Sequence, residues 1–294
     1  MRRLEAPGVY EGIPAADYHA DPCPEPSLSS SLVRAISSKS PWHAMQMHPR
    51  FGGHGPADST TFDLGTAAHA YILEGEERWV EVDANDWRTK AAQQQRDEAR
   101  DEGLIPILSR HANNVRDMAR EVKRGLALFE DPKPLGGDGT PETTVVWKEQ
   151  TPHGEVWCRA RPDWLHHDGL TVDDLKTTGT SAEPRAFIRH LFNSDYHLQA
   201  AFYLRGIKAV AEGDGEPTFR FVVVENEAPY AISVIALDPM ALDIAHDVVQ
   251  QAINAWALGL KTKVWPAYPK RVCYAEAPAW LVAREAEDLE RGDE

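Results

Sequence analysis

Polar and apolar residues alternate with a period of two in the middle of the chain, over residues 156–178, which read VWCRARPDWLHHDGLTVDDLKTT. This period is typical of β-strands, and the polar stretch His166–Gly169 interrupts it as a turn would, so a β-hairpin is predicted. The other periodic segments, capping residues and turns predict helices near residues 28–40, 62–73, 86–102, 109–129, 183–192, 195–213 and 239–260, and strands at 142–147, 217–225 and 230–237. This order of elements indicates an α/β (α+β) fold with a central mixed β-sheet flanked by helices.

Three charged side chains of the predicted hairpin share one face: Asp163 in the first strand, and Asp174 and Lys176 in the second. Since unpaired charge is costly to bury, this group is poor core material. Two carboxylates suit Mg²⁺, which completes its octahedron with water and phosphate oxygens, and the lysine can hold or polarise an attacking water. An isolated D-x-K is as a rule a surface salt bridge of little energetic value, so it is the aligned Asp163 that favours a site for phosphodiester hydrolysis.

The neighbours of these residues have their own alternatives. Arg159 and Arg161 lie on the same predicted face as Asp163, where they can pair with the acids in the absence of substrate or bind phosphate groups. We favour the phosphate role for Arg161. Asp173 falls on the opposite face and is predicted to be solvated or to cap a neighbouring segment.

Composition narrows the class of protein. With 294 residues, 42% hydrophobic residues and nine Trp, the chain can bury a substantial core as one large domain or two small ones. The formal net charge of −15 argues against nucleic-acid binding over the whole surface, but a local basic channel stays compatible with it. The three dispersed cysteines and the lack of a signal-peptide or membrane-spanning run predict reduced thiols and a cytoplasmic location.

Several well-known catalytic motifs are absent from the sequence. Neither G-x-G-x-x-G nor G-x-x-x-x-G-K-[ST] occurs, which argues against an ATP-driven motor, and neither G-x-S-x-G nor H-E-x-x-H is present. The acids of the predicted hairpin are therefore the best candidate chemistry.

Five segments occur in a characteristic order: GVYEGIPAADYHA and LSSSLVRAISSKSPWH near the start, GTAAHAYILEG, RPDWL with DLKTT, and YHLQAAFY. The set resembles the PDDEXK nuclease superfamily, in particular the phage-type exodeoxyribonucleases similar to RecE, with lambda exonuclease and the RecB nuclease domain as more distant relatives. The resemblance covers most of the chain. It implies a restriction-endonuclease-like PDDEXK core and a single nuclease domain over 1–294, with an N-terminal wrapping segment and helix (1–60), the core (61–260) and a C-terminal tail (261–294).

The resemblance also implies a metal site. His69 becomes a metal ligand together with Asp163, Asp174 and the backbone carbonyl of Leu175, whereas a histidine on an alanine-rich helix is by itself more often a core residue. Glu142 matches the place of another acidic ligand, and a merely solvated glutamate at the start of a strand is the alternative.

Two further residues match the family's Q-x-x-x-Y helix. Gln199 and Tyr203 are four residues apart and hence on one helix face. The resemblance implies that they support Lys176 or the scissile phosphate, while ordinary core packing is the alternative.

The implied activity is Mg²⁺-dependent hydrolysis, with Mn²⁺ as an alternative ion, of linear duplex DNA from an end in phage-type recombination. A homo-oligomeric ring around the DNA and a single-strand annealing protein are the expected partners, with no membrane. The alternatives are a catalytically silent PDDEXK-fold DNA-binding or interaction module, an endonuclease, and a hydrolase of RNA or nucleotides that uses the same site.

Overall fold

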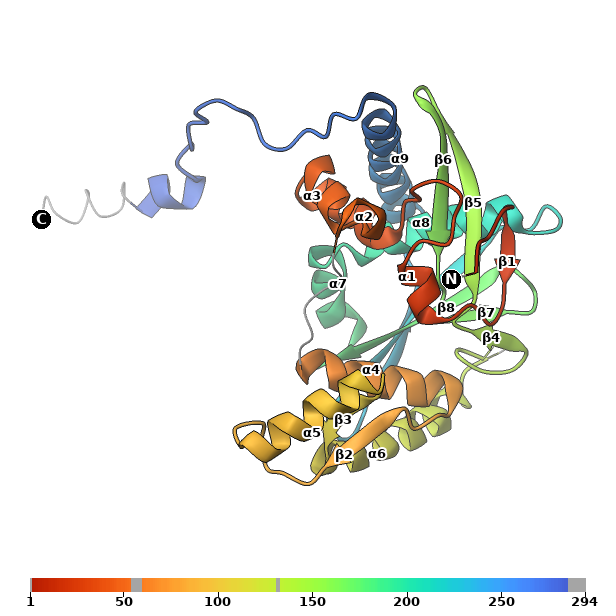
Figure 1. Cartoon of the computed structure of the whole chain (residues 1–294), viewed down its shortest axis with the longest axis vertical. Helices are drawn as coiled ribbons and strands as arrows, with labels where there is room; N and C mark the ends of the chain where they lie inside the picture. The colour runs from red at the N-terminus through yellow and green to blue at the C-terminus, as the bar shows by residue number, and fades with distance from the viewer. Residues whose placement is uncertain (1, 54–59, 131–132, 285–294) are drawn as a thin grey trace, which may run out of the picture.

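The computed structural model describes residues 2–53, 60–130 and 133–284, with the backbone alone for 60–64. In chain order (Figure 1) its elements are β1 (Gly8–Tyr10), α1 (Ala15–His19), α2 (Ser30–Ser38), α3 (Pro41–Met47), the 3-10 turn η1 (Pro49–Phe51), α4 (Thr60–Glu74), β2 (Trp79–Val82), α5 (Lys90–Asp101), β3 (Ile105–Leu108), α6 (Ser109–Leu126), β4 (Gly139–Pro141), β5 (Thr144–Thr151), β6 (Gly154–Ala160), β7 (Trp164–His166), β8 (Thr171–Thr178), α7 (Pro184–Asn193), α8 (Tyr196–Val210), β9 (Thr218–Glu225), β10 (Ile232–Ile235) and α9 (Pro239–Thr262).

A five-stranded sheet with the order β10-β9-β8-β7-β4 crosses the molecule. Strands β8 and β9 run parallel, and the other neighbours are antiparallel, so the sheet is mixed. A second sheet has the order β1-β5-β6, and β2 and β3 form a parallel pair. The predicted mixed α+β fold is confirmed.

Both faces of the five-stranded sheet are covered, as the continuous apolar run FVVV of β9 indicates. Phe221 and Val223 belong to the core that α8 and α9 share, whereas Val222 and Val224 pack with Leu175 against α4 and α6. Figure 1 shows α4, α5 and α6 together as one part of the molecule, with α2, α3, α7, α8 and α9 on the other side of the sheet.

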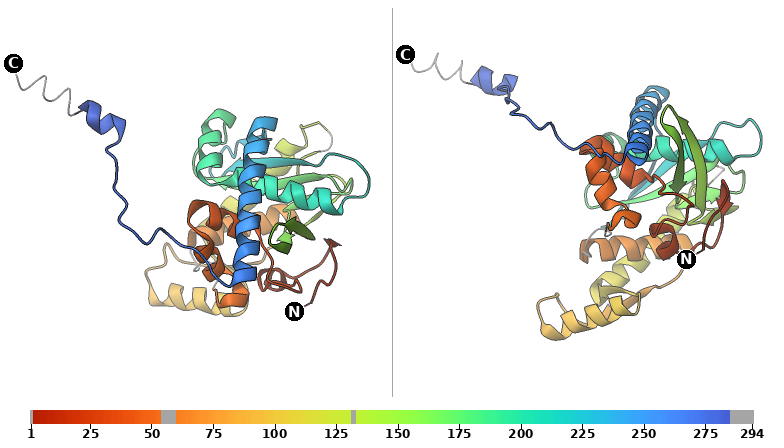
Figure 2. Two further views of the ribbon diagram at one scale, coloured as in Figure 1. Left: turned by 90° about the horizontal axis from the view of Figure 1, so that it is seen from above. Right: turned by 45° about the horizontal axis from the view of Figure 1, so that its top comes forward.

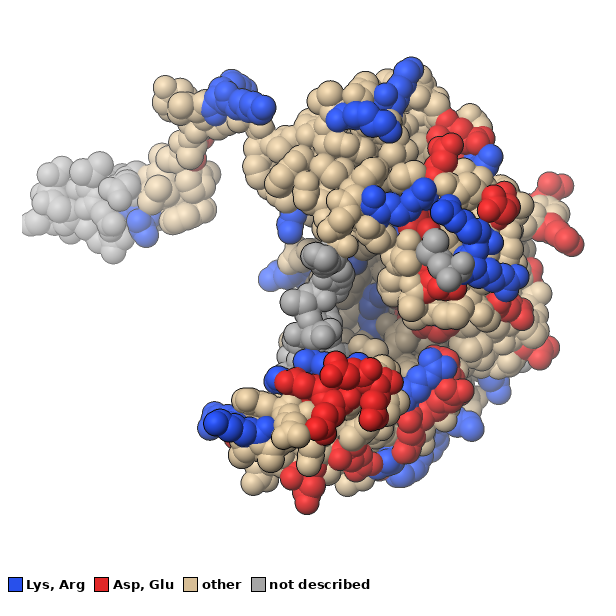
Figure 3. Space-filling view, viewed as in Figure 1, with Lys and Arg blue, Asp and Glu red and all other residues tan. Residues whose placement is uncertain are grey.

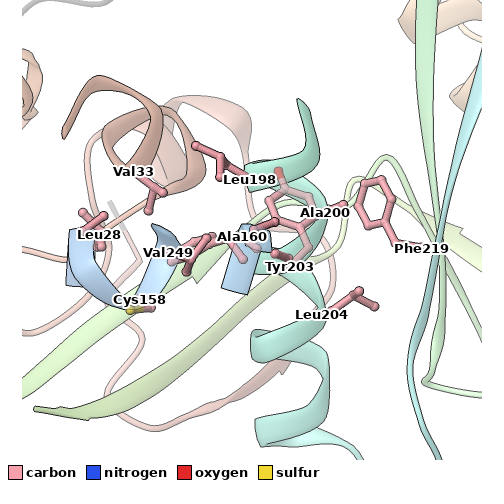
Figure 4. Close-up of a cluster of buried hydrophobic side chains, with 14 of the residues drawn as sticks. Leu28, Val33, Cys158, Ala160, Leu198, Ala200, Tyr203, Leu204, Phe219 and Val249 are labelled. Atoms are coloured by element: carbon pink, nitrogen blue, oxygen red, sulfur yellow. The ribbon is translucent and has the colours of Figure 1, made fainter. Parts of the chain in front are cut away.

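The larger core is built around α8, which packs on β5 and β6. Figure 4 shows Val33 of α2, Cys158 and Ala160 of β6, and Tyr203 of α8 meeting Val249 of α9. The approach is close at Gly206, where a Cβ would lie 2.7 Å from the ring of Trp147. A side chain at this position would push α8 away from the sheet and displace the residues that the helix presents.

The hairpin predicted over 156–178 is wrong in its pairing. The first run forms β6, which pairs with β5, and only the short strand β7 forms a hairpin with β8. Pro162 lies between β6 and β7, and a proline has no N–H to donate to the ladder, so the strand ends there. Asp163 therefore sits at a break between two sheets and not on the face of one.

The wrapping role of the N-terminal segment stays a prediction, and part of this segment contributes to the interior. Leu4, Ile13 and Cys23 are buried in a cluster of their own with Val146 of β5 and Trp157 of β6. Among the described residues, no helix has both the length and the apolar character needed to cross a membrane.

The described residues that follow α9, 263–284, lead away from the end of this helix and project from the body in all views (Figures 1 and 2). Residues 49–51 form η1, and residues 54–59 of the N-terminal segment lie outside the described residues. The same holds for residues 285–294 of the predicted tail.

Candidate active site

Separate elements bring the predicted site residues together. Helix α4 supplies His69, the turn before β5 supplies Glu142, the break after β6 supplies Asp163, and β8 supplies Asp174 and Lys176. These elements border the hollow that Figure 3 shows between the α4–α6 part and the rest of the molecule, where Lys or Arg atoms are visible inside.

A histidine and two carboxylates form a compact cluster. His69 Nε2 lies 2.9 Å from Asp163 Oδ2, and His69 Nδ1 lies 3.4 Å from Glu142 Oε1. One donor atom of each residue can be chosen so that all lie within 4.8 Å of one another. The side chains are partly accessible, with exposed fractions of 29% for His69 and 14% for Asp163. This geometry can hold a metal ion.

The backbone around Glu142 holds this cluster together. Glu142 was predicted to begin the strand, but it precedes β5. Its φ of 54° is left-handed, a conformation that costs a non-glycine residue about 1–3 kcal/mol. Its N–H donates to the carbonyl of Asp163 at 3.1 Å, and Asp163 Oδ2 accepts the N–H of Leu175 at 2.7 Å. These bonds fix both carboxylates relative to β8.

Lys176 is held on three sides. Its Nζ forms an ion pair with Asp174 Oδ2, lies 3.2 Å from Gln199 Oε1 and faces the ring of Tyr196 at 4.7 Å from the centroid. Gln199 Nε2 donates to Asp174 Oδ1 at 2.6 Å, so the glutamine bridges the acid and the lysine. Tyr203 donates its hydroxyl to the carbonyl of Arg161 at 3.2 Å and supports the segment that leads to Asp163.

The charges of the site perturb one another. Burial, and to a lesser degree the charge of Asp163, raise the pKa of Asp174 to about 6 against the lowering effect of Lys176. Burial lowers the pKa of His69, but the charge and hydrogen bond of Asp163 and the charge of Glu142 raise it to about 9. The pKa of Lys176 is raised, because the charges of Asp174 and Asp163 outweigh its burial. The lysine therefore stays a cation.

The donor set fits a divalent metal ion. Carboxylate oxygens are the ligands that Mg²⁺ prefers, and an imidazole beside them also suits Mn²⁺. Asp174 Oδ2 is buried and makes no hydrogen bond of acceptable geometry, although Lys176 lies against it as an ion pair. A cation nearby would satisfy this oxygen. To serve as a ligand, His69 must release the proton that its acidic neighbours stabilise.

The two arginines of β6 and the segment after it have different partners. Arg161 forms an ion pair with Glu142 and donates to the carbonyl of Ile13 at 2.9 Å, so it pairs with an acid in the absence of substrate. Its contact with a DNA phosphate stays a prediction. Arg159 is buried, with 4% exposure, against Asp21 and Ser27 of the N-terminal segment and lies outside the site.

The prediction that Asp173 is solvated or caps a segment is wrong. Its carboxylate is fully buried, lies 2.8 Å from His166 Nε2, and accepts hydrogen bonds from Arg220 and from the N–H of Leu135. Strand β8 has a neighbour on each side and helices on both faces, so neither face of the D-D pair is left to solvent. Asp173 is a structural ion-pair residue.

Tyr196 was not among the predicted site residues. A signal for it exists in the sequence, because Tyr196 and Gln199 are three residues apart and share a helix face. The cation–π contact with Lys176 could not be inferred from this spacing, since it depends on how α8 packs on β8.

Tyr196→Leu is expected to lower kcat of the predicted DNA cleavage roughly tenfold with little change in KM, because Lys176 loses its contact with the aromatic ring. Tyr196→Phe keeps the aromatic face and is expected to stay close to the parent. Steady-state kinetics of DNA cleavage tests both. Equal impairment of the two variants would show that the hydroxyl, and not the ring, matters.

His69→Ala is expected to leave the fold intact and to abolish cleavage or to raise the Mg²⁺ concentration required by about tenfold or more. The reason is the loss of one ligand from the cluster with Glu142 and Asp163. Cleavage rates over a Mg²⁺ series measure this, with His167→Ala in the exposed β7–β8 turn as the control. Full activity at the ordinary Mg²⁺ concentration would remove His69 from the site.

Comparison with known proteins shows the family of the chain. Residues 29–278 match the model of a PDDEXK-like domain of unknown function, DUF3799. The chain belongs to this family. The predicted PDDEXK resemblance is thereby confirmed, while the closer likeness to RecE-type exonucleases stays a prediction. No curated protein matches the sequence.

A solved structure shares the fold of this DUF3799 protein. A crystal structure described as a putative exonuclease from Eubacterium rectale matches with a TM-score of 0.57 and 12% identity, over 95% of this chain and 97% of that chain. A structure of a protein named SSO0001 matches with a TM-score of 0.29 and 14% identity, over 67% of this chain and 86% of that chain. At 12% identity the first match shows a common fold over nearly the whole chain.

Proposed function

We propose that this DUF3799 protein is a divalent-metal-dependent deoxyribonuclease that hydrolyses phosphodiester bonds of linear duplex DNA from an end. The observation that supports it is the convergence of the His69–Glu142–Asp163 cluster with the Asp174–Lys176 pair at one break between two sheets. The PDDEXK-like family and the fold shared with a putative exonuclease point in the same direction.

The donor set suggests separate roles for the metal ion and for the side chains. Mg²⁺ or Mn²⁺ held by His69, Glu142, Asp163 and Asp174, with the carbonyl of Leu175 as a further ligand, would supply a Lewis acid for the phosphoryl oxygens and a lowered pKa for water. The side chains of Lys176 and Arg161 would orient the attacking water and stabilise the charge on the phosphate.

Lys176 is the group best placed to hold the attacking water. Its ammonium is fixed by Gln199 and Tyr196, and its raised pKa favours a role as a fixed positive charge over that of a base. Such a preorganised charge stabilises the charge that develops on the phosphoryl group. When Arg161 leaves Glu142, its guanidinium can bind a phosphate bidentately, and Glu142 becomes free for the metal.

The family resemblance extends the proposal to partners. We place the protein in phage-type recombination in the cytoplasm, where it leaves a single strand for a single-strand annealing protein. A homo-oligomeric ring enclosing the DNA would reconcile a formal net charge of −15 with a DNA substrate, because the acidic residues can face outward.

Metal binding separates this proposal from a catalytically silent module. Titration calorimetry with Mn²⁺ and Mg²⁺ is expected to show binding by the parent protein and an affinity lower by about tenfold or more in Asp163→Asn. Asp214→Asn, at an exposed loop, removes the same charge outside the site and serves as the control. A folded parent that binds neither ion would favour the silent DNA-binding module.

A further inference from the structure

The first part of the C-terminal tail, residues 261–275, has a composition unlike the rest of this acidic chain. It carries Lys261, Lys263, Lys270 and Arg271 and no acidic residue, and Tyr268 and Tyr274 are interleaved with the cations. We propose that this basic tail, defined as residues 261–275, is a DNA-binding segment that contacts the phosphate backbone of the substrate. The proposal rests on the proposed nuclease function and adds a substrate-binding surface to it.

The start of the basic tail is anchored to the body. The ring of Trp265 packs 4.8 Å from that of Trp256 of α9 and 5.8 Å from that of Phe51, measured between centroids. The carbonyl of Pro266 accepts the N–H of Trp42 at 3.0 Å. Gly259 makes room for this arrangement, because a Cβ there would lie 2.3 Å from the Trp265 ring. The tail therefore starts from a fixed point beside α3.

Beyond the anchor the chain is extended and accessible. The exposed fraction is 62% for Tyr268 and 91% for Tyr274, and Lys270 and Arg271 are exposed. Before the anchor, Lys261 at the end of α9 and Lys263 are exposed as well. Two prolines, Pro266 and Pro269, restrict the backbone to extended conformations and keep this stretch semi-rigid. Figure 2 shows the segment projecting from the body, and Figure 3 shows Lys or Arg atoms at its surface.

Within the described residues, the cations of the basic tail lack the acidic partners that two arginines of α6 have. On α6, Arg120 pairs with Asp117 and Arg124 pairs with Glu121, each an acid on the preceding turn. In the part of the chain that the structure describes, none of the four tail cations forms an ion pair. Unpaired cations that an acidic protein concentrates in one projecting segment suit a polyanion, and aromatic residues among them are typical of segments that bind nucleic acid.

Equilibrium binding to DNA tests the proposal. The parent and K261Q/K263Q/K270Q/R271Q are compared with a labelled duplex and a labelled single strand by fluorescence anisotropy, in EDTA to prevent cleavage and over a series of KCl concentrations. The tail variant is expected to bind duplex roughly tenfold or more weakly, with a slope of log K against log salt that is shallower by about three to four. A larger loss on the single strand would identify the product strand as the main contact.

The control variant R120Q/K123Q/R124Q/K208Q removes as many positive charges from exposed helical positions, and its salt slope is expected to stay close to that of the parent. Tail and control variants that both bind DNA like the parent would overturn the proposal. So would a tail variant that loses self-association in sedimentation while its salt slope is unchanged, because the tail would then bind a second copy. A parent that binds no DNA would overturn the proposed function as well.

Discussion

Lys176→Met is expected to lower the rate of DNA cleavage by about 10³-fold while the protein stays folded. Among the described residues, Lys176 is the cation that forms an ion pair with Asp174. Methionine removes this charge and keeps a side chain of similar length. Asp174 keeps its hydrogen bond from Gln199, and burial already raises its pKa to about 6, so it can take up a proton instead of staying an unpaired charge. The loss is therefore expected in catalysis and not in folding.

Release of acid-soluble nucleotides measures this effect, and circular dichroism checks the fold. Lys208→Met provides a matched control, because Lys208 is an exposed lysine of α8 whose surface pair with Glu216 contributes little. Cleavage by Lys176→Met within tenfold of the parent would contradict the assignment of the site.

Asp21→Asn is expected to destabilise the protein by about 3–5 kcal/mol, the second large effect. The carboxylate of Asp21 is fully buried and lies 3.3 Å from Arg159 and 3.2 Å from His48 Nε2, and it accepts the N–H and the hydroxyl of Ser27. Loss of its charge leaves the buried guanidinium of Arg159 without compensation. The network ties the N-terminal segment to β6.

Urea unfolding of the parent and of Asp21→Asn gives the free energies of unfolding. Glu216→Gln, in an exposed pair with Lys208 of α8, is the control and is expected to change stability by less than about 1 kcal/mol. A loss below about 1 kcal/mol in Asp21→Asn would contradict the importance of the buried pair.

The same carboxylate predicts a pH dependence. Burial raises the pKa of Asp21, but the hydrogen bonds and charges of His48, Arg159 and Ser27 outweigh it and lower the pKa to about 2. A group with a lower pKa in the folded state stabilises the fold above its unfolded-state pKa and loses that contribution as the pH falls. The stability difference between the parent and Asp21→Asn should therefore shrink as the pH falls from about 4 to about 2.

The motif predicts the residues of the candidate site because it places them in a fixed order, and their catalytic roles stay a prediction. Asp163, Asp174 and Lys176 meet as expected, and Gln199 bridges the last two. The strand pairing that brings these residues together was not predictable from the sequence. The period of two shows that residues 156–160 form a strand, but it does not identify the partner strand, and β6 pairs with β5.

The burial of individual side chains was also not predictable from local sequence patterns. Asp173 looks solvated in a run with two adjacent acids, yet its charge is matched by Arg220 from β9, which is distant in sequence. Strands β2 and β3 were not predicted, because a parallel pair of four-residue strands has too few alternations to be recognised. Tyr196 was missed because its role depends on the packing of α8.

Digestion of linear and covalently closed circular duplex DNA tests the central claim most directly, with RNA as a further substrate and Mg²⁺, Mn²⁺ or EDTA in parallel reactions. The proposed function predicts that the parent releases nucleotides from linear DNA alone, and that EDTA and Lys176→Met each abolish the release. Cutting of circles would keep the chemistry and make the protein an endonuclease, and preferential digestion of RNA would change the substrate. No cleavage of any of these substrates by a folded, metal-bound parent would contradict the claim that this site is a nuclease.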